Sequence, residues 1–140
     1  MDASPATVRV SMATSHEGLS HMSAFQPASL LRAEGAVLLM AATTLYWKED
    51  ASWLLFAVAF FLPDLSMVGY LAGNRIGAAA YNAAHSSVLP VALAVIGVVT
   101  DGSLFIAVAL IWLAHIGFDR LLGYGLKYAD GFKETHLART

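Results

Sequence analysis

Four stretches of mainly apolar residues follow one another along the chain. They cover residues 29–47, 51–72, 75–99 and 103–124. Short polar breaks separate them, namely KED at 48–50, GNR at 73–75 and TDG at 100–102. A helix needs about 20 apolar residues to cross a hydrocarbon layer of about 30 Å. Each stretch has roughly that length, so the pattern predicts four transmembrane helices.

The connections between these stretches are too short to cross the bundle, so consecutive helices must run antiparallel. We therefore expect an all-α fold, a multi-pass integral membrane up-down four-helix bundle over residues 28–128. The composition agrees, because 58% of the residues are hydrophobic and 13% are charged. Soluble domains are typically about 45–50% apolar and about 25% charged.

The first 27 residues differ from the rest. They are rich in Ser, Ala and Thr and lack the apolar centre of a secretion signal. We expect a mobile N-terminal tail here, and Met12 or Met22 as alternative starts. Residues 129–140 are expected to form a cytoplasmic C-terminal tail.

Basic residues are distributed unevenly over the two predicted sides. The side that holds both termini has seven of the eight Lys and Arg, namely Arg9, Arg32, Arg75, Arg120, Lys127, Lys133 and Arg139. The other side has only Lys48. Lys and Arg in short loops favour the cytoplasm. The distribution predicts a plasma-membrane protein with both termini inside the cell.

Charge and cysteine content exclude several classes. The net charge of −2 is too small to indicate nucleic acid as a partner. The chain has no cysteine, which excludes disulfides, zinc–thiolate sites and thiol catalysis. The expected partners are the lipid bilayer and a lipid-like small molecule, and the oligomeric state stays open.

Ionisable residues inside the apolar stretches are predicted to converge. At about 1.5 Å per residue, the antiparallel path brings residues of all four helices to overlapping depths in the cytoplasmic half: Glu34, Asp64, His85, His115 and Asp119. A charged side chain at the centre of a membrane costs about 2.5–3.5 kcal/mol on insertion scales, so such residues usually face the bundle interior. Pro63 and Pro90 are expected to kink their helices beside these residues.

This set of imidazoles and carboxylates is suited to a divalent metal such as Zn, Fe or Mn. Asp64, His85, His115 and Asp119 are the candidate ligands, with Glu34 as an additional one. Without a metal, an Asp–His pair could act as a general acid and base or relay protons. The structural alternatives are an Asp119–Arg120 ion pair, histidines that hydrogen-bond across the bundle, and Glu34 either paired with Arg32 or lying among the lipid headgroups.

Three motifs resemble, in order, the signature blocks of the small bacterial membrane family called domain of unknown function 4260: LPDLSMVGYLAG, GAAAYNAAHSSVLP and AHIGFDRLLGYGLKYADGFKETHL. The resemblance covers residues 29–138 and implies no established activity. It singles out Asp64, Tyr81, Asn82, His85, His115, Asp119, Arg120, Tyr124, Lys127 and His136. Lys127 and His136 are candidates for binding an anionic head group, or for contacting anionic lipids as a juxtamembrane basic segment.

Three functions remain open at this point. The first is a hydrolase, metal-dependent or acid–base, acting on an amphipathic or lipid-like substrate. Its catalytic residues would be Asp64, His85, His115 and Asp119, and its substrate-binding residues Tyr81, Asn82, Arg120, Tyr124 and Lys127. The second is a proton-coupled transporter, which the scarcity of polar residues in the other half disfavours. The third is a structural membrane subunit without a catalytic role.

Overall fold

The computed structural model describes residues 27–127, which are organised entirely around helices. The elements are α1 (Pro27–Lys48), α2 (Trp53–Ala59), η3 (Pro63–Ala72), α3 (Asn74–His85), α4 (Val88–Val99) and α5 (Ser103–Leu122). The two predicted tails, and His136 with them, lie outside the described residues. The all-α prediction is confirmed for the described part of the chain.

Four helical segments are long and apolar enough to cross a membrane. They are Pro27–Lys48, Trp53–Ala72, Asn74–Val99 and Ser103–Leu122. Their ends lie within two residues of those predicted from the hydrophobic pattern. Large apolar side chains also cover the outside of the molecule; Leu54, Leu71 and Val99 are 74%, 88% and 76% exposed.

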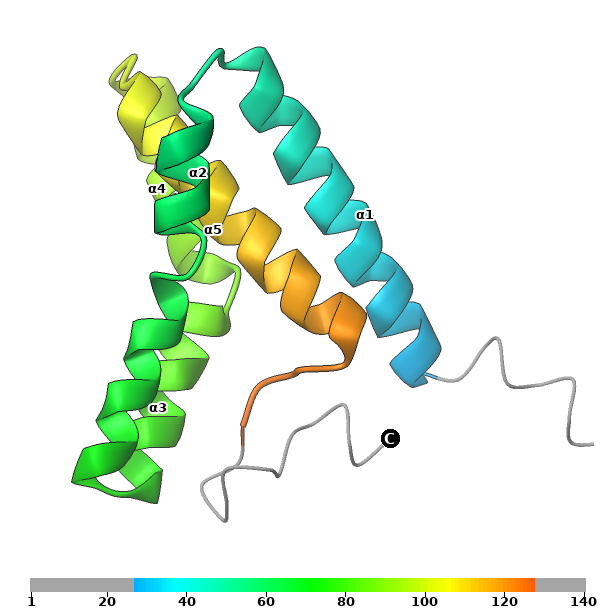
Figure 1. Cartoon of the computed structure of the whole chain (residues 1–140), viewed down its shortest axis with the longest axis vertical. Coiled ribbons are helices and arrows are strands. Elements are labelled where there is room, and N and C mark those ends of the chain that lie inside the picture. Colours follow the sequence, from blue (N-terminus) through cyan, green and yellow to red (C-terminus); the bar gives the residue numbers. More distant parts are fainter. Residues whose placement is uncertain (1–26, 128–140) are drawn as a thin grey trace, which may run out of the picture.

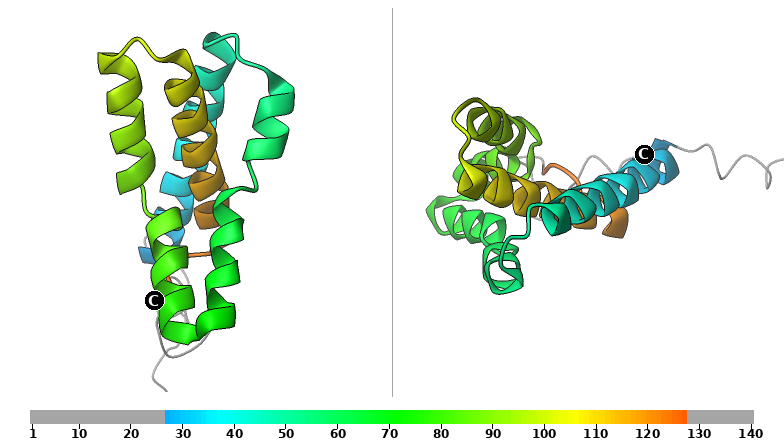
Figure 2. Two further views of the ribbon diagram at one scale, coloured as in Figure 1. Left: turned by 90° about the vertical axis from the view of Figure 1, so that its left-hand side faces the viewer. Right: turned by 90° about the horizontal axis from the view of Figure 1, so that it is seen from above.

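Two of these segments are interrupted halfway, and Figure 2 shows both interruptions at a similar height. The second segment breaks before Pro63, which has no N–H to donate to the carbonyl of Ala59; the N–H of Leu62 bonds to that carbonyl instead (3.1 Å). The third segment breaks at Ser86, which has an extended backbone (φ −85°, ψ 145°). Pro90 cannot donate to the Ser86 carbonyl, and this favours the second break.

Helix α5 is the central element of the fold. It packs against α1, α4 and α2, while η3 and α3 form a hairpin and pack on each other. Figure 1 shows this hairpin diverging from the α1–α5 pair. The α1–α5 crossing is close because two glycines meet there: a Cβ on Gly35 would lie 2.7 Å from the Cβ of Arg120, and one on Gly117 would lie 2.6 Å from the backbone N of Leu39.

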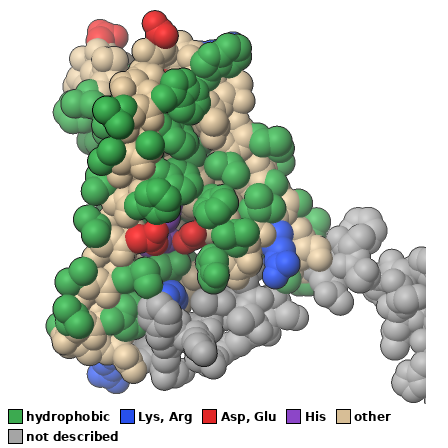
Figure 3. All heavy atoms as spheres, in the orientation of Figure 1, with side chains coloured by type: hydrophobic (Ala, Val, Ile, Leu, Met, Phe, Trp, Pro, Cys, Tyr) green, Lys and Arg blue, Asp and Glu red, His purple; other side chains and the backbone are tan. Residues whose placement is uncertain are grey.

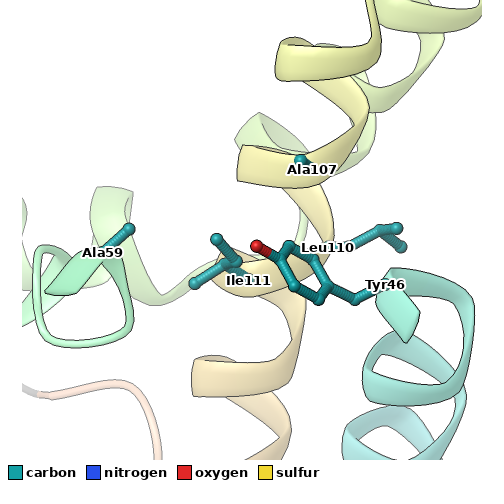
Figure 4. Packing of buried hydrophobic residues seen from close by; sticks show 5 residues of the cluster. All are labelled: Tyr46, Ala59, Ala107, Leu110 and Ile111. Carbon is teal, nitrogen blue, oxygen red and sulfur yellow. The ribbon is translucent and has the colours of Figure 1, made fainter. Parts of the chain in front are cut away.

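A small apolar core joins α1, α2 and α5. It contains Tyr46, Ala59, Ala107, Leu110 and Ile111 (Figure 4). The Tyr46 ring is fully buried, and its hydroxyl donates to the Ser52 carbonyl (2.6 Å) just before α2. Ile111 lies one turn before His115 on α5. This core therefore fixes the part of α5 that directly precedes His115.

Candidate metal centre

Two imidazoles and two carboxylates meet where the two interruptions face α5. Asp64 is the second residue of η3, and His85 is the last residue of α3. His115 and Asp119 lie one turn apart on α5. Each side chain contributes one ligand atom, and the four atoms lie within 4.8 Å of one another. The structure thus brings together four of the residues that the sequence predicted to converge.

Five of the six distances among these atoms are close to those between ligands of one small ion. His85 Nε2 lies 3.2 Å from His115 Nε2, 3.4 Å from Asp119 Oδ2 and 3.5 Å from Asp64 Oδ1. His115 Nε2 lies 3.6 Å from Asp64 Oδ1 and 3.8 Å from Asp119 Oδ2. A tetrahedral ion with bonds of about 2.0–2.2 Å has its ligand atoms about 3.3–3.6 Å apart. The histidine–carboxylate distances also exceed the roughly 2.7–2.9 Å of a charge-assisted hydrogen bond.

Tyr81 orients two members of the cluster. His85 Nδ1 lies 2.9 Å from the Tyr81 carbonyl, which can only accept, so Nδ1 carries the hydrogen. In the neutral imidazole the Nε2 lone pair then points into the cluster, as in metal-binding histidines. The Tyr81 ring stacks on the His85 ring (3.7 Å, 12°), and its hydroxyl donates to Asp119 Oδ2 (3.2 Å).

His115 is the most deeply buried member, with 2% of its surface exposed. Its ring contacts Phe60 edge to face (5.2 Å), and Phe60 belongs to the first interruption. Its Nδ1 has no hydrogen-bond partner among the described residues. Its polar contacts in this part of the chain are therefore made through Nε2, the atom that faces the cluster.

Among the four described members of the cluster, Asp64 is the most exposed. His85 is 5% exposed, and the Asp119 side chain is 15% exposed, whereas the Asp64 side chain is 40% exposed. Figure 3 shows acidic groups with a histidine behind them, in a surface that is otherwise mainly hydrophobic. Asp64 is therefore the member that a molecule from outside meets first.

The segment after α5 is held against α3 beside the cluster. The Asn82 side chain makes two hydrogen bonds to the backbone of Lys127: Nδ2 donates to the carbonyl (2.8 Å), and Oδ1 accepts from the N–H (2.7 Å). The Lys127 ammonium lies over the Tyr81 ring (4.3 Å) and the Tyr70 ring (5.5 Å). These two hydrogen bonds place the Lys127 ammonium near the carboxylates of Asp64 and Asp119.

The pKa of the Lys127 ammonium depends on this position. Burial lowers the pKa of its ammonium, and the negative charges of Asp119 and Asp64 act in the opposite direction. The ammonium is therefore within electrostatic reach of both carboxylates. It is suited to contact an anionic group bound at the cluster.

The other predicted residues lie around the cluster or away from it. Arg120 directs Nη2 to the Ser87 hydroxyl (3.1 Å), whereas the neighbouring Asp119 faces the two histidines. Arg120 and the exposed Tyr124 line a cavity of ≈ 10 Å³ that His85 and Asp119 also border. Glu34 is exposed on α1 and lies outside the four-residue group.

Sequence reasoning did not identify three contacts: the Tyr81 carbonyl on His85, Phe60 on His115, and the Asn82 bonds to Lys127. The first had a signal, since Tyr81 and His85 are spaced i, i+4 and share one helix face. The Phe60–His115 and Asn82–Lys127 contacts join residues that are far apart in the sequence. The spacing of residues along one helix does not reveal such contacts.

Comparison with known proteins gives a family without an assigned activity. The chain matches the family Domain of unknown function (DUF4260) over residues 28–140 and belongs to it. No curated protein and no solved structure matches the chain.

Proposed function

We propose that this member of the DUF4260 family is a membrane-embedded, metal-dependent hydrolase whose ion is held by Asp64, His85, His115 and Asp119. One observation carries the proposal: four ligand atoms from η3, α3 and α5 lie within 4.8 Å of one another, and His85 Nε2 lies 3.2–3.5 Å from the other three. The fixed tautomer of His85 supports it, because the bare nitrogen faces the centre.

The membrane placement rests on the four apolar segments and on the charge distribution. We propose that these segments span the plasma membrane as an up-down bundle, with both termini in the cytoplasm. Asp64 is the twelfth residue of its 20-residue segment, and His115 is the thirteenth of its 20. The cluster would then lie at or just to the cytoplasmic side of the membrane centre.

Zinc fits the donors best. Structural and catalytic zinc sites are bound by His nitrogen and Asp oxygen in tetrahedral geometry. Iron and manganese accept the same ligand types but commonly take more of them. Among the described residues, four side chains can act as ligands here, and this number suits zinc.

The proposed reaction is the addition of water to a bond of an amphipathic substrate. A zinc ion lowers the pKa of a bound water to about 7. Asp64, His85, His115 and Asp119 would hold the ion, which would supply an activated water for hydrolysis. Asp64 is the most exposed of the four, so we propose that its carboxylate accepts a proton from the attacking water and donates it to the leaving group. The Tyr81 hydroxyl holds Asp119 in place beside the two histidines.

A structural metal is the second candidate. It is favoured by the full set of four protein ligands, since structural zinc sites are closed whereas catalytic sites keep one position open. In this role the ion would join the ends of η3 and α3 to α5. The two candidates differ in whether a small molecule can reach the ion.

Metal content of protein purified in mild detergent tests the proposal. We expect close to one zinc per wild-type chain and a loss of zinc in His85→Ala and in His115→Ala. Glu34→Gln is the matched control, because Glu34 is exposed and outside the cluster, and it should keep its zinc. If no divalent metal is found in any wild-type preparation, the metal centre is refuted, and the acid–base alternative gains support.

Cobalt replacement then separates a catalytic from a structural ion. Tetrahedral cobalt(II) has visible absorption bands that depend on its ligands. In a catalytic site, added cyanide should shift these bands because one position can open at Asp64. An unchanged spectrum at saturating cyanide would favour the structural ion and refute the hydrolase.

A further inference from the structure

An apolar cleft adjoins the cluster of Asp64, His85, His115 and Asp119 on the side of α2. Its volume is ≈ 310 Å³, and its walls come from α2, η3, α3, α5 and the first interruption. Its lining residues are Ala59, Leu62, Pro63, Ser66, Ala84, Val108 and Trp112. The cleft exists because two helices are interrupted at this level.

The cleft and the cluster share their walls. Pro63 and Ala84 line the cleft, and each directly precedes a proposed ligand, Asp64 and His85. On α5, Val108 and Trp112 lie seven residues before His115 and Asp119 respectively. At about 3.6 residues per turn, residues seven apart lie on one face of a helix. The cleft therefore continues the line of the cluster along α5.

Trp112 keeps this wall in place. The interruption at Ser86 separates the Ala84 carbonyl from the N–H of Val88, its partner in a continuous helix. The indole N–H of Trp112 donates to that carbonyl instead. This bond satisfies the Ala84 carbonyl, and the cleft wall is mainly apolar, with the Ser66 hydroxyl as a polar group in its lining. A mainly apolar wall suits a hydrocarbon.

We propose that this cleft binds a single alkyl chain of an amphipathic substrate, whose polar group then lies at the metal cluster. This assignment rests on the proposed function and names its substrate class. The volume is at the lower end of the roughly 300–1,000 Å³ found for ligand pockets. We therefore assign the space to one alkyl chain and not to the two chains of a lipid.

A polar head with an oxygen anion would complete the arrangement. Its oxygen would face the ion beside the exposed Asp64, and the Lys127 ammonium lies within electrostatic reach of the same carboxylates. The chain would extend from there past Pro63 and Ala84 toward Val108. In a bilayer the surrounding lipid is as apolar as the cleft, so the cleft selects by shape rather than by hydrophobicity.

Photolabelling of the full chain in nanodiscs tests this assignment. The probe is lauric acid with a diazirine near its methyl end, and mass spectrometry of the labelled protein locates the adduct. We expect labelling of the cleft residues in the wild type, suppressed by excess unlabelled lauric acid. Val108→Trp, which fills the cleft, should lose this labelling. Val98→Trp is the matched control, since Val98 is 67% exposed on α4, and it should keep it.

Zinc content measured on the same samples separates the two proposals. Val108→Trp with full zinc and no cleft labelling supports the chain site in a correctly folded protein. Wild type with zinc but with adducts only outside the cleft overturns the chain site and leaves the metal centre intact. Cleft labelling in wild type without zinc retains the chain site and overturns the metal centre. Because the wild-type adduct map decides by itself, the test holds even if Val108→Trp does not fold.

Discussion

Tyr81 acts on the cluster through two groups that a single substitution can separate. Its carbonyl fixes His85, and its hydroxyl donates to Asp119. Tyr81→Phe keeps the carbonyl and the stacked ring but removes the bond to Asp119. Loss of such a partner of a metal ligand typically costs about 10–100-fold in metal affinity. We expect a decrease in zinc affinity of that order, measured by competition with a chelating dye.

The control for this variant is Tyr124→Phe. Tyr124 is 57% exposed and borders the small cavity beside the cluster, so it should bind zinc as the wild type does. Equal affinities in Tyr81→Phe and wild type would show that Asp119 does not depend on Tyr81.

At the same scale, the sequence predicted the height of each ionisable residue but not the direction of its side chain. Glu34 was predicted near the cluster from its depth in the membrane, yet on α1 Gly35 faces α5 and Glu34 is exposed. Consecutive residues of a helix point about 100° apart. Depth along a helix therefore does not distinguish an inward ligand from an outward carboxylate, whereas an i, i+4 spacing such as that of His115 and Asp119 places two residues on one face.

The Asn82 side chain holds the segment after α5 against α3. Asn82→Ala removes both hydrogen bonds to the Lys127 backbone. Each bond contributes about 0.5–1.5 kcal/mol, so opening of this segment should become roughly 5–150-fold more frequent. Hydrogen exchange of the Lys127 amide measures this directly. Asn74→Ala, at the exposed start of α3, is the control, and equal acceleration in both variants would contradict the role of Asn82.

Helix α1 is a support rather than a part of the cluster. Gly35→Val would place Cβ 2.7 Å from the backbone N of Leu121 and 2.8 Å from the Gly117 carbonyl, where no flexible side chain can yield. Overpacking of this kind typically costs about 1–3 kcal/mol. We expect a loss of that size in the free energy of unfolding in detergent. Ala33→Val, on the exposed face of α1, should have little effect.

Zinc content distinguishes support from participation in the same variants. The ligands come from η3, α3 and α5, so Gly35→Val should retain its zinc while the protein is folded. Loss of zinc from folded Gly35→Val would mean that α1 positions the ligands after all.

The interruptions show where prediction at the scale of elements reached its limit. Pro63 and Pro90 predicted kinks, because a proline removes one hydrogen bond. In the structure, the second segment continues after Leu62 as the 3-10 helix η3, through i→i−3 hydrogen bonds, whereas the third segment breaks at the extended Ser86. Local sequence cannot predict the break at Ser86, because it is compensated by a tertiary contact, the Trp112 bond to the Ala84 carbonyl.

For the whole molecule, hydrophobic length was sufficient to predict the four segments, since the ends follow from short polar breaks. The splayed arrangement was not predictable. It depends on the close Gly35–Gly117 crossing and on the packing of Gly77 against the Tyr70 ring, where a Cβ would clash with that ring. Small residues indicate close packing but not which helices approach each other.

Orientation in the membrane is testable because the chain has no cysteine, so single cysteines can be introduced without background. Glu49 and Thr100 are exposed and lie in the α1–α2 and α4–α5 turns, whereas Asn74 is exposed at the η3–α3 turn, at the other end of the molecule (Figure 1). With both termini inside, a membrane-impermeant maleimide should label Glu49→Cys and Thr100→Cys in spheroplasts. Asn74→Cys should react only after lysis. The reverse pattern would invert the topology, and labelling of all three before lysis would show that the segments do not span the membrane.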